Sequence, residues 1–120
     1  CNTDRQALQS ITNKNVVKVQ LGTGLGAGMD TEEGRRAAEE SIDDLRALLA
    51  PPIKMLFITA GMGGGTGTGA APVIAQLARE MGLLTVAVVT APYKYEGTEK
   101  KEQAMRGIEL LKESCDTVLV

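Results

Sequence analysis

The chain has 120 residues, a net charge of −2 and an aromatic content of only 2%. Without a basic footprint or aromatic stacking platforms, nucleic-acid binding is disfavoured, and no apolar stretch approaches the ~18 residues of a membrane-spanning helix. Cys1 and Cys115 stand far apart and the chain has no histidine, so a metal site and a Cys–His nucleophile are also disfavoured. Composition therefore indicates one domain, or part of one.

The first half of the chain predicts a strand, a loop, a helix and a second strand. β-Branched residues favour a strand over 16–21, and glycines form a loop over 22–28. Asp30 caps a helix that runs to about Leu49, where two consecutive prolines end it. The short apolar run over 55–60 then predicts a buried strand.

The second half predicts the same alternation. Its elements are a glycine-rich loop over 61–67, a helix from about Thr68 that Gly82 ends, a strand over 83–90, a turn over 91–97, a helix over 97–113 and a last strand from Thr117. Strands that alternate with helices in this way indicate βαβ units with right-handed crossovers.

The predicted fold class is therefore α/β, a Rossmann-like parallel sheet with helices on both faces. The nearly continuous apolar character of 83–90 is typical of a parallel strand that is covered on both faces. In such folds a ligand binds at the carboxyl ends of the strands. The loops 22–28, 61–67 and 91–97 all follow strands, so we expect them to meet at one site.

The run from Gly61 to Gly69 contains six glycines in nine residues. A buried strand that leads through glycines into a helix start is a place where phosphates bind, because backbone N–H groups can approach the anion closely. The run has no Walker-type lysine. A dinucleotide fingerprint fits over 65–70, but the next strand lacks the acidic residue that this fingerprint requires. A merely flexible loop is the structural alternative.

Four segments, in order, resemble the tubulin/FtsZ family in its bacterial cell-division form. They are NTDRQAL over 2–8, GLGAG over 24–28 followed by EGR over 33–35, AGMGGGTGTGAAPVIA over 60–75, and LTVAVVTAPYKYEG over 84–97. The resemblance covers nearly the whole chain. It implies that the chain is part of a tubulin/FtsZ GTPase domain.

The resemblance also implies a binding site for GTP or GDP, with Mg²⁺, at residues that match the family's motifs. These are Gly63, Gly64, Gly65, Thr66 and Gly67 in the phosphate loop, Ala27 and Gly28 in a second backbone loop, Asn2, Thr3 and Asp4 near the phosphates and metal, Glu96 at the ribose, and Lys100 where the family usually has arginine. We expect a side chain at Gly65 to occupy the space of a phosphate oxygen. The residues by themselves favour a helix cap over 2–4 and a solvated carboxylate at Glu96, and they leave Ala27 and Gly28 open as a plain turn.

At the level of the whole protein, the resemblance implies that residues 1–120 are a partial GTP-binding domain without the first strand, its glycine-rich loop and the C-terminal half. The parent is expected to be a cytoplasmic GTPase that polymerises head to tail at the bacterial division site. Division-machinery proteins are the expected partners, and membrane contact is indirect. The water-activating aspartates come from a neighbouring subunit in this family, so we assign no catalytic and no metal-ligating residue here and expect the chain alone to be inactive. A nucleotide-dependent assembly module without turnover and a Rossmann NAD(P)-binding protein are the alternatives.

Overall fold

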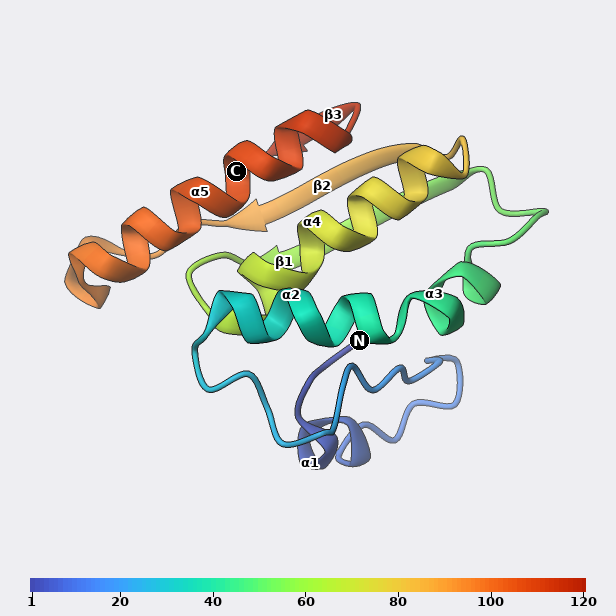
Figure 1. Ribbon diagram of the computed structural model, residues 1–120, viewed down its shortest axis with the longest axis horizontal. Helices are drawn as coiled ribbons and strands as arrows, with labels where there is room; N and C mark the ends of the chain where they lie inside the picture. The colour runs from blue at the N-terminus through green and yellow to red at the C-terminus, as the bar shows by residue number, and fades with distance from the viewer.

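A computed structural model describes residues 1–120 (Figure 1). In chain order the elements are α1 (Arg5–Gln9), α2 (Thr31–Glu40), α3 (Ile42–Leu48), β1 (Met55–Gly61), α4 (Gly65–Glu80), β2 (Leu84–Thr90), the 3₁₀ turn η1 (Lys94–Glu96), α5 (Thr98–Ser114) and β3 (Thr117–Leu119). None of the helices is both long and apolar enough to cross a bilayer.

The three strands form one parallel sheet in the order β1-β2-β3. Phe57 of β1 pairs with Val86 of β2, and Val86 pairs with Thr117 of β3. Helix α4 connects β1 to β2, and α5 connects β2 to β3. The α/β class and the parallel sheet that the sequence predicts are therefore confirmed.

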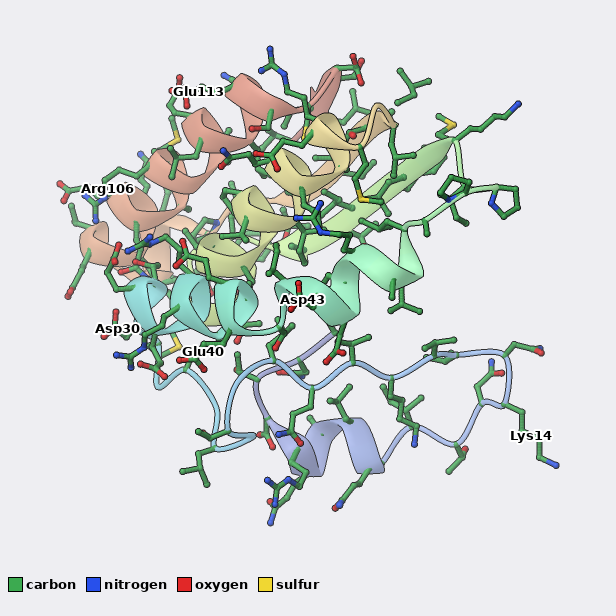
Figure 2. All side chains as sticks on the ribbon, turned by 45° about the vertical axis from the view of Figure 1, so that its right-hand side comes forward. Lys14, Asp30, Glu40, Asp43, Arg106 and Glu113 are labelled. Atoms are coloured by element: carbon green, nitrogen blue, oxygen red, sulfur yellow. The ribbon has the colours of Figure 1, made fainter.

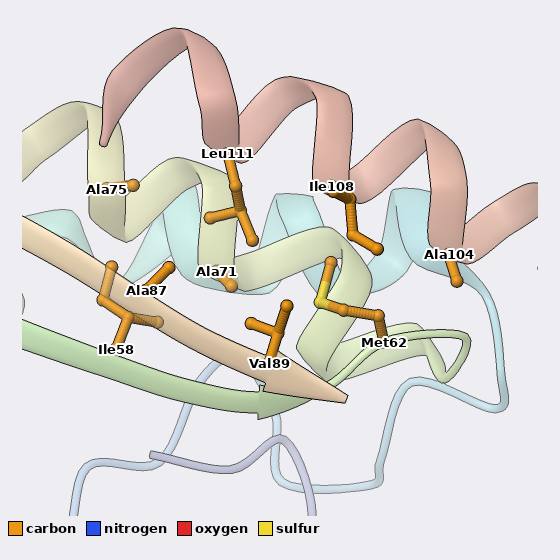
Figure 3. Close-up of a cluster of buried hydrophobic side chains, with 9 residues drawn as sticks. All are labelled: Ile58, Met62, Ala71, Ala75, Ala87, Val89, Ala104, Ile108 and Leu111. Carbon is orange, nitrogen blue, oxygen red and sulfur yellow. The ribbon is translucent and has the colours of Figure 1, made fainter. Parts of the chain in front are cut away.

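The main core lies between the sheet and helices α4 and α5 (Figure 3). Side chains from all three elements meet there: Ile58, Met62, Ala71, Ala75, Ala87, Val89, Ala104, Ile108 and Leu111. The alanines let the helices approach the strands closely. Burial of such apolar surface, at about 25 cal/mol per Å², is the main stabilising contribution here.

A second core joins α2 to the other side of α4. It contains Val19, Leu21, Ala37, Ala38, Leu45, Ala70 and Leu77. Helix α2 runs alongside α4, and both begin at the same end of the molecule (Figure 1). Charged side chains such as Glu40, Arg106 and Glu113 point outward from the helices (Figure 2).

Helices on both faces of the sheet are not found within this chain. Helices α4 and α5 cover the face that carries Thr85, Ala87 and Val89, all of which are buried. On the other face Phe57 is 61% exposed and Val88 is 42% exposed. The apolar pattern of the strands is typical of a sheet that is covered on both faces, but within these 120 residues helices cover only one face.

The strand predicted over 16–21 is wrong. The structure has only an isolated bridge between Asn2 and Gln20 there, and Val17 is 69% exposed. The backbone N–H of Asn2 donates to the Val19 carbonyl, and the N–H of Leu21 donates to the Asn2 carbonyl. β-Branched residues favour extended backbone, but a strand forms only where a partner edge of sufficient length lies beside it.

The helix predicted from Asp30 to Leu49 is broken at Ser41. The backbone of Ser41 lies outside the α region, at φ −100° and ψ 13°, and separates α2 from α3. Its hydroxyl accepts a hydrogen bond from the Gly22 N–H at 3.3 Å. The break therefore coincides with a contact between Ser41 and a segment 19 positions earlier in the chain.

Helix α4 begins at Gly65, three residues earlier than the sequence predicts, and it ends where predicted. Gly82 has a φ of +76° and its N–H donates to the Arg79 carbonyl, while the Leu83 N–H donates to the Ala78 carbonyl. This pair of bonds is a Schellman motif, which requires a left-handed residue such as glycine. Part of the glycine-rich loop is thus the first turn of the helix.

Candidate functional site

Three segments that are distant in sequence line one cavity at the carboxyl end of the sheet. The cavity measures about 220 Å³ and is lined by Met29, Gly63, Glu96, Glu99, Lys100 and Gln103. Met29 precedes α2, Gly63 follows β1, and the other four residues belong to the turn after β2 and to α5. The expected convergence of these three segments is therefore present.

The first turn of α4, two residues after Gly63, supplies free backbone donors. Gly64 is the N-cap residue, in extended conformation at φ −82° and ψ 170°. No hydrogen bond in the structure uses the N–H groups of Gly65, Thr66 or Gly67. The first turn carries no acidic residue, so the positive end of the helix dipole is not compensated by a side chain. Such a helix end favours an anion.

The second backbone loop packs directly against this helix start. A Cβ atom on Gly65 would lie 2.8 Å from the backbone N and O of Asp30 and 2.9 Å from the Ala27 Cβ. Gly28 and Met29 turn the chain there with φ values of +57° and +65°. The structure therefore brings Ala27 and Gly28 next to the glycine-rich loop.

The glycines of the loop face different surroundings. A Cβ atom on Gly67 would overlap the Gly61 carbonyl, and one on Gly69 would overlap the Thr31 carbonyl of α2. A Cβ atom on Gly64 would meet nothing within 4 Å. The expectation that a side chain at Gly65 occupies the space of a phosphate oxygen is thus wrong, because it would point at the Asp30 backbone and Ala27, just before α2. Gly64 is the position that opens outward.

Gly63 shapes the loop and does not offer a free donor. Its φ is +110°, a conformation that glycine adopts at little cost. Its N–H donates to the Thr68 Oγ1 at 2.6 Å, so the buried Thr68 closes the turn with its side chain. The Gly63 carbonyl accepts from the Gln103 amide at 3.2 Å.

At the N-terminus, Thr3 contacts the glycine-rich loop. The Thr3 Oγ1 lies 2.6 Å from the Thr66 Oγ1, and Thr3 is only 4% exposed. The Asn2 Oδ1 accepts from the Asp4 N–H at 3.1 Å. The Asp4 Oδ1 accepts from the backbone N–H groups of Gln6 and Ala7, which makes it the cap of α1. The helix-cap interpretation of this segment is therefore confirmed, and of its three residues Thr3 is the one whose side chain contacts the glycine-rich loop.

Glu96 and Lys100 form an ion pair on the cavity wall. The Lys100 Nζ lies 3.5 Å from the Glu96 Oε1, and the two side chains are about one-third exposed, at 34% and 31%. The Glu96 Oε2 accepts from the Tyr93 N–H at 2.6 Å. Both residues line the cavity, and in this structure they pair with protein groups.

Gln103 is a site residue that sequence reasoning missed. It lies three residues after Lys100, so both fall on one face of α5 and both line the cavity. The Gln103 amide contacts the two loops described above. The helical spacing from Lys100 was the signal that could have identified it.

The cysteines supply no activated nucleophile. Burial raises the pKa of the Cys115 thiol, and the neighbouring Asp116 raises it further. Cys115 therefore stays protonated at neutral pH, whereas a nucleophilic cysteine needs a lowered pKa. Cys1 is free and exposed.

The fold and the site define an α/β protein with a strand, a glycine-rich turn and a helix start at the carboxyl edge of a parallel sheet. A model of the tubulin/FtsZ family, GTPase domain, matches residues 1–120. The chain belongs to the tubulin/FtsZ family.

Individual relatives agree with this assignment. The chain is 52% identical to the cell division protein FtsZ of Aquifex aeolicus over 99% of its length, and 54% identical to the cell division protein FtsZ 2 of Rhizobium meliloti over 99%. It covers 33% and 35% of these two proteins, so it spans about a third of their length.

Solved structures match as well. An empty FtsZ dimer from M. jannaschii superimposes with a TM-score of 0.90 at 43% identity, over 97% of this chain and 34% of that one. A GTPγS-bound protofilament of CetZ2 from Haloferax volcanii gives a TM-score of 0.86 at 28% identity, over 98% of this chain and 37% of that one.

Proposed function

We propose that this chain is the phosphate-binding part of a GTP-binding domain in an FtsZ-like GTPase. The observation that carries the proposal is the start of α4, where the N–H groups of Gly65, Thr66 and Gly67 have no acceptor and no acidic side chain compensates the dipole. The family assignment, as a GTPase domain, supports the same ligand class.

In the proposed complex each segment has a defined task. The free N–H groups of α4 donate to phosphate oxygens, and Ala27 and Gly28 approach the phosphates through their backbone from the second loop. Glu96 accepts from a ribose hydroxyl, and Lys100 adds a positive charge at the same wall. Because Glu96 and Lys100 pair with each other in this structure, ligand binding exchanges part of that pair for contacts to the nucleotide.

A bound Mg²⁺ is not held by a carboxylate cage of this chain. No three His, Cys, Asp or Glu side chains lie close enough together to hold a metal ion. Mg²⁺ commonly binds to substrate phosphates and keeps several water ligands. In our proposal phosphate oxygens and water therefore supply the coordination, and the chain contributes the loops that hold the phosphates.

Hydrolysis and assembly belong to the full-length protein. Fixed backbone dipoles orient and stabilise the phosphates, and carboxylates from a neighbouring subunit orient the attacking water. The full-length protein then forms head-to-tail homopolymers in the cytoplasm at the bacterial division site. It works there with division-machinery proteins and reaches the membrane only through them. The relatives' description as cell division proteins, and the dimer and protofilament forms of the matched structures, support this proposal.

The test is a titration of the full-length protein with GTP, ATP and NAD, combined with phosphate release and sedimentation. We expect GTP to bind tightly and ATP and NAD to bind at least 100-fold more weakly, with phosphate release that rises on assembly. Binding and assembly without phosphate release would instead indicate a module without turnover. Preference for NAD would contradict the proposal.

A further inference from the structure

The side chain of Gln103 joins the two loops that face the proposed phosphate site. Its Nε2 lies 3.2 Å from the Met29 carbonyl and 3.2 Å from the Gly63 carbonyl. A glutamine amide has two N–H donors. One residue of α5 therefore provides one donor for each loop.

Both acceptors lie at the turns that determine the shape of the loops. Met29 and Gly63 have φ values of +65° and +110°, each in the region that L-residues rarely adopt. A local hydrogen bond also closes each turn, since the Asp30 N–H donates to the Ala27 carbonyl and the Gly63 N–H donates to the Thr68 hydroxyl. Gln103 is the side chain that hydrogen-bonds directly to both of these turns.

No backbone hydrogen bond links residues 27–30 to residues 61–66. Apart from Gln103, these segments meet through packing contacts around Gly65 and Ala27, and indirectly through Thr3, whose carbonyl accepts from the Gly26 N–H and whose hydroxyl bonds to Thr66. Packing and a bond between two rotatable hydroxyl groups allow small sliding movements, whereas two hydrogen bonds from one planar amide set a distance and a direction. Gln103 also lies on the helix that carries Lys100, so the same amide relates both loops to the cavity wall.

We propose that Gln103 is a positioning residue that holds the two phosphate-facing loops at a fixed spacing and couples them to α5. The inference rests on the proposed function, because the spacing matters only if both loops bind the same phosphates. Gln103 acts through the carbonyls of Met29 and Gly63, and its amide has no free N–H left for the ligand.

The test uses three variants of the full-length protein. Gln103→Met keeps the length of the side chain and removes both donors, and Gln103→Lys restores a donor at the same place. Gln76→Met is the matched control, because Gln76 lies exposed on α4 and its side chain makes no hydrogen bond. Hydrogen exchange of the nucleotide-free protein, GTP affinity and thermal unfolding are measured for each.

For Gln103→Met we expect exchange of the Asp30 and Gly63 amides to become about five- to tenfold faster, since both report on the held turns. GTP affinity should fall about tenfold, in line with two lost hydrogen bonds, with an unfolding midpoint close to wild type. Gln103→Lys should recover most of both effects, and Gln76→Met should match wild type.

Unchanged exchange in both loops would overturn the proposal. A loss of GTP affinity that only follows a lower unfolding midpoint, without recovery in Gln103→Lys, would overturn it as well. A wild-type protein that binds no GTP would overturn the proposed function instead, and the exchange comparison would then decide on the coupling of the loops by itself.

Discussion

The hydroxyl groups of Thr3 and Thr66 lie 2.6 Å apart and hydrogen-bond to each other across 63 positions of sequence. Thr3 is buried beside the first turn of α4. The N-terminal segment is thereby tied to the glycine-rich loop at a single polar point. Thr66 is also the residue whose N–H is free for a ligand, so a structural contact and a proposed binding contact meet at one residue.

Thr3→Val should destabilise the full-length protein by about 1–2 kcal/mol. Valine has the same shape, but it leaves the Thr66 hydroxyl without its partner in a partly buried place. Urea unfolding measures the change. Thr3→Ser is the control, because it keeps the hydroxyl, and a valine variant as stable as the serine variant would contradict the prediction.

Gly64→Ala should fold normally and bind GTP about tenfold more weakly. Its backbone conformation is open to alanine, and the added methyl meets no protein atom within 4 Å. The methyl then reaches the side from which we expect the phosphates to approach. Isothermal titration measures the affinity, and an unchanged GTP affinity in a folded Gly64→Ala protein would argue against a phosphate at this position.

Gly65→Val should have a different effect, a loss of stability. Its side chain would enter the space of the Asp30 backbone and the Ala27 methyl. Overpacking of this kind costs typically 1–3 kcal/mol. Lost GTP binding in this variant therefore has to be compared with thermal unfolding, and a Gly65→Val protein of full stability would refute the packing assignment.

Glu96→Ala should weaken GTP binding by roughly tenfold, as expected for one lost hydrogen bond to a charged group. If Glu96 binds the ribose, the variant should no longer distinguish 2′- or 3′-deoxy-GTP from GTP. Competition titration with these nucleotides is the measurement. Glu102→Ala, at an exposed position of the following helix α5, is the control that should behave as wild type.

Cys115 should react slowly with iodoacetamide and become reactive only at alkaline pH. Burial and Asp116 raise its pKa in the folded protein, so the folded state holds this proton more tightly than the unfolded state does. The resulting stabilisation is complete below the pKa of the unfolded thiol and is lost as the pH rises through the folded value. The measurement is the alkylation rate of Cys115 between pH 7 and 10, determined by mass spectrometry. A rate like that of an ordinary exposed thiol over this pH range would contradict the prediction.

The isolated 120-residue chain should show no GTP hydrolysis and little cooperative unfolding. Strand β1 pairs only with β2, and a cavity of about 270 Å³ separates its other side from Cys1 and Leu21. Unpaired backbone groups cost ~1–3 kcal/mol each where they are buried, against a total stability of ~5–15 kcal/mol. Phosphate release comparable to a full-length homologue, or a sharp transition in a monomeric sample, would refute this prediction.

The elements that could be predicted from sequence are those that local residues determine. Gly82 ends α4 because a left-handed cap is a local requirement, and the apolar run after Lys54 forms β1 as predicted. The failures depend on distant partners. Residues 16–21 favour extended backbone, but no long edge lies beside them. Ser41 ends α2 in contact with Gly22, which no helix pattern contains.

The site shows the same division. The glycine-rich run predicts a phosphate loop by composition, and the structure places it beside Ala27 and near Glu96 and Lys100. The direction in which a side chain at each of these glycines would point could not be predicted, because it depends on how α2 and the end of β1 lie against α4. Gln103 is an ordinary polar residue in sequence, and only the folded chain brings it to the loops.

The close contact between α2 and α4 changes what the glycine signature means as evidence. Gly65, Gly67 and Gly69 must be small because another backbone occupies the space of their side chains. A protein in which α4 packs in this way against α2, Asp30 and the end of β1 would need these three glycines even if it had lost every ligand. The signature therefore diagnoses the packing of α4 as much as the nucleotide. Within the signature, only at Gly64 would a side chain face open space, so only this glycine distinguishes a requirement of packing from a requirement of nucleotide binding. A relative with a larger residue at this one position is therefore a candidate for a family member that keeps the fold and no longer binds the ligand.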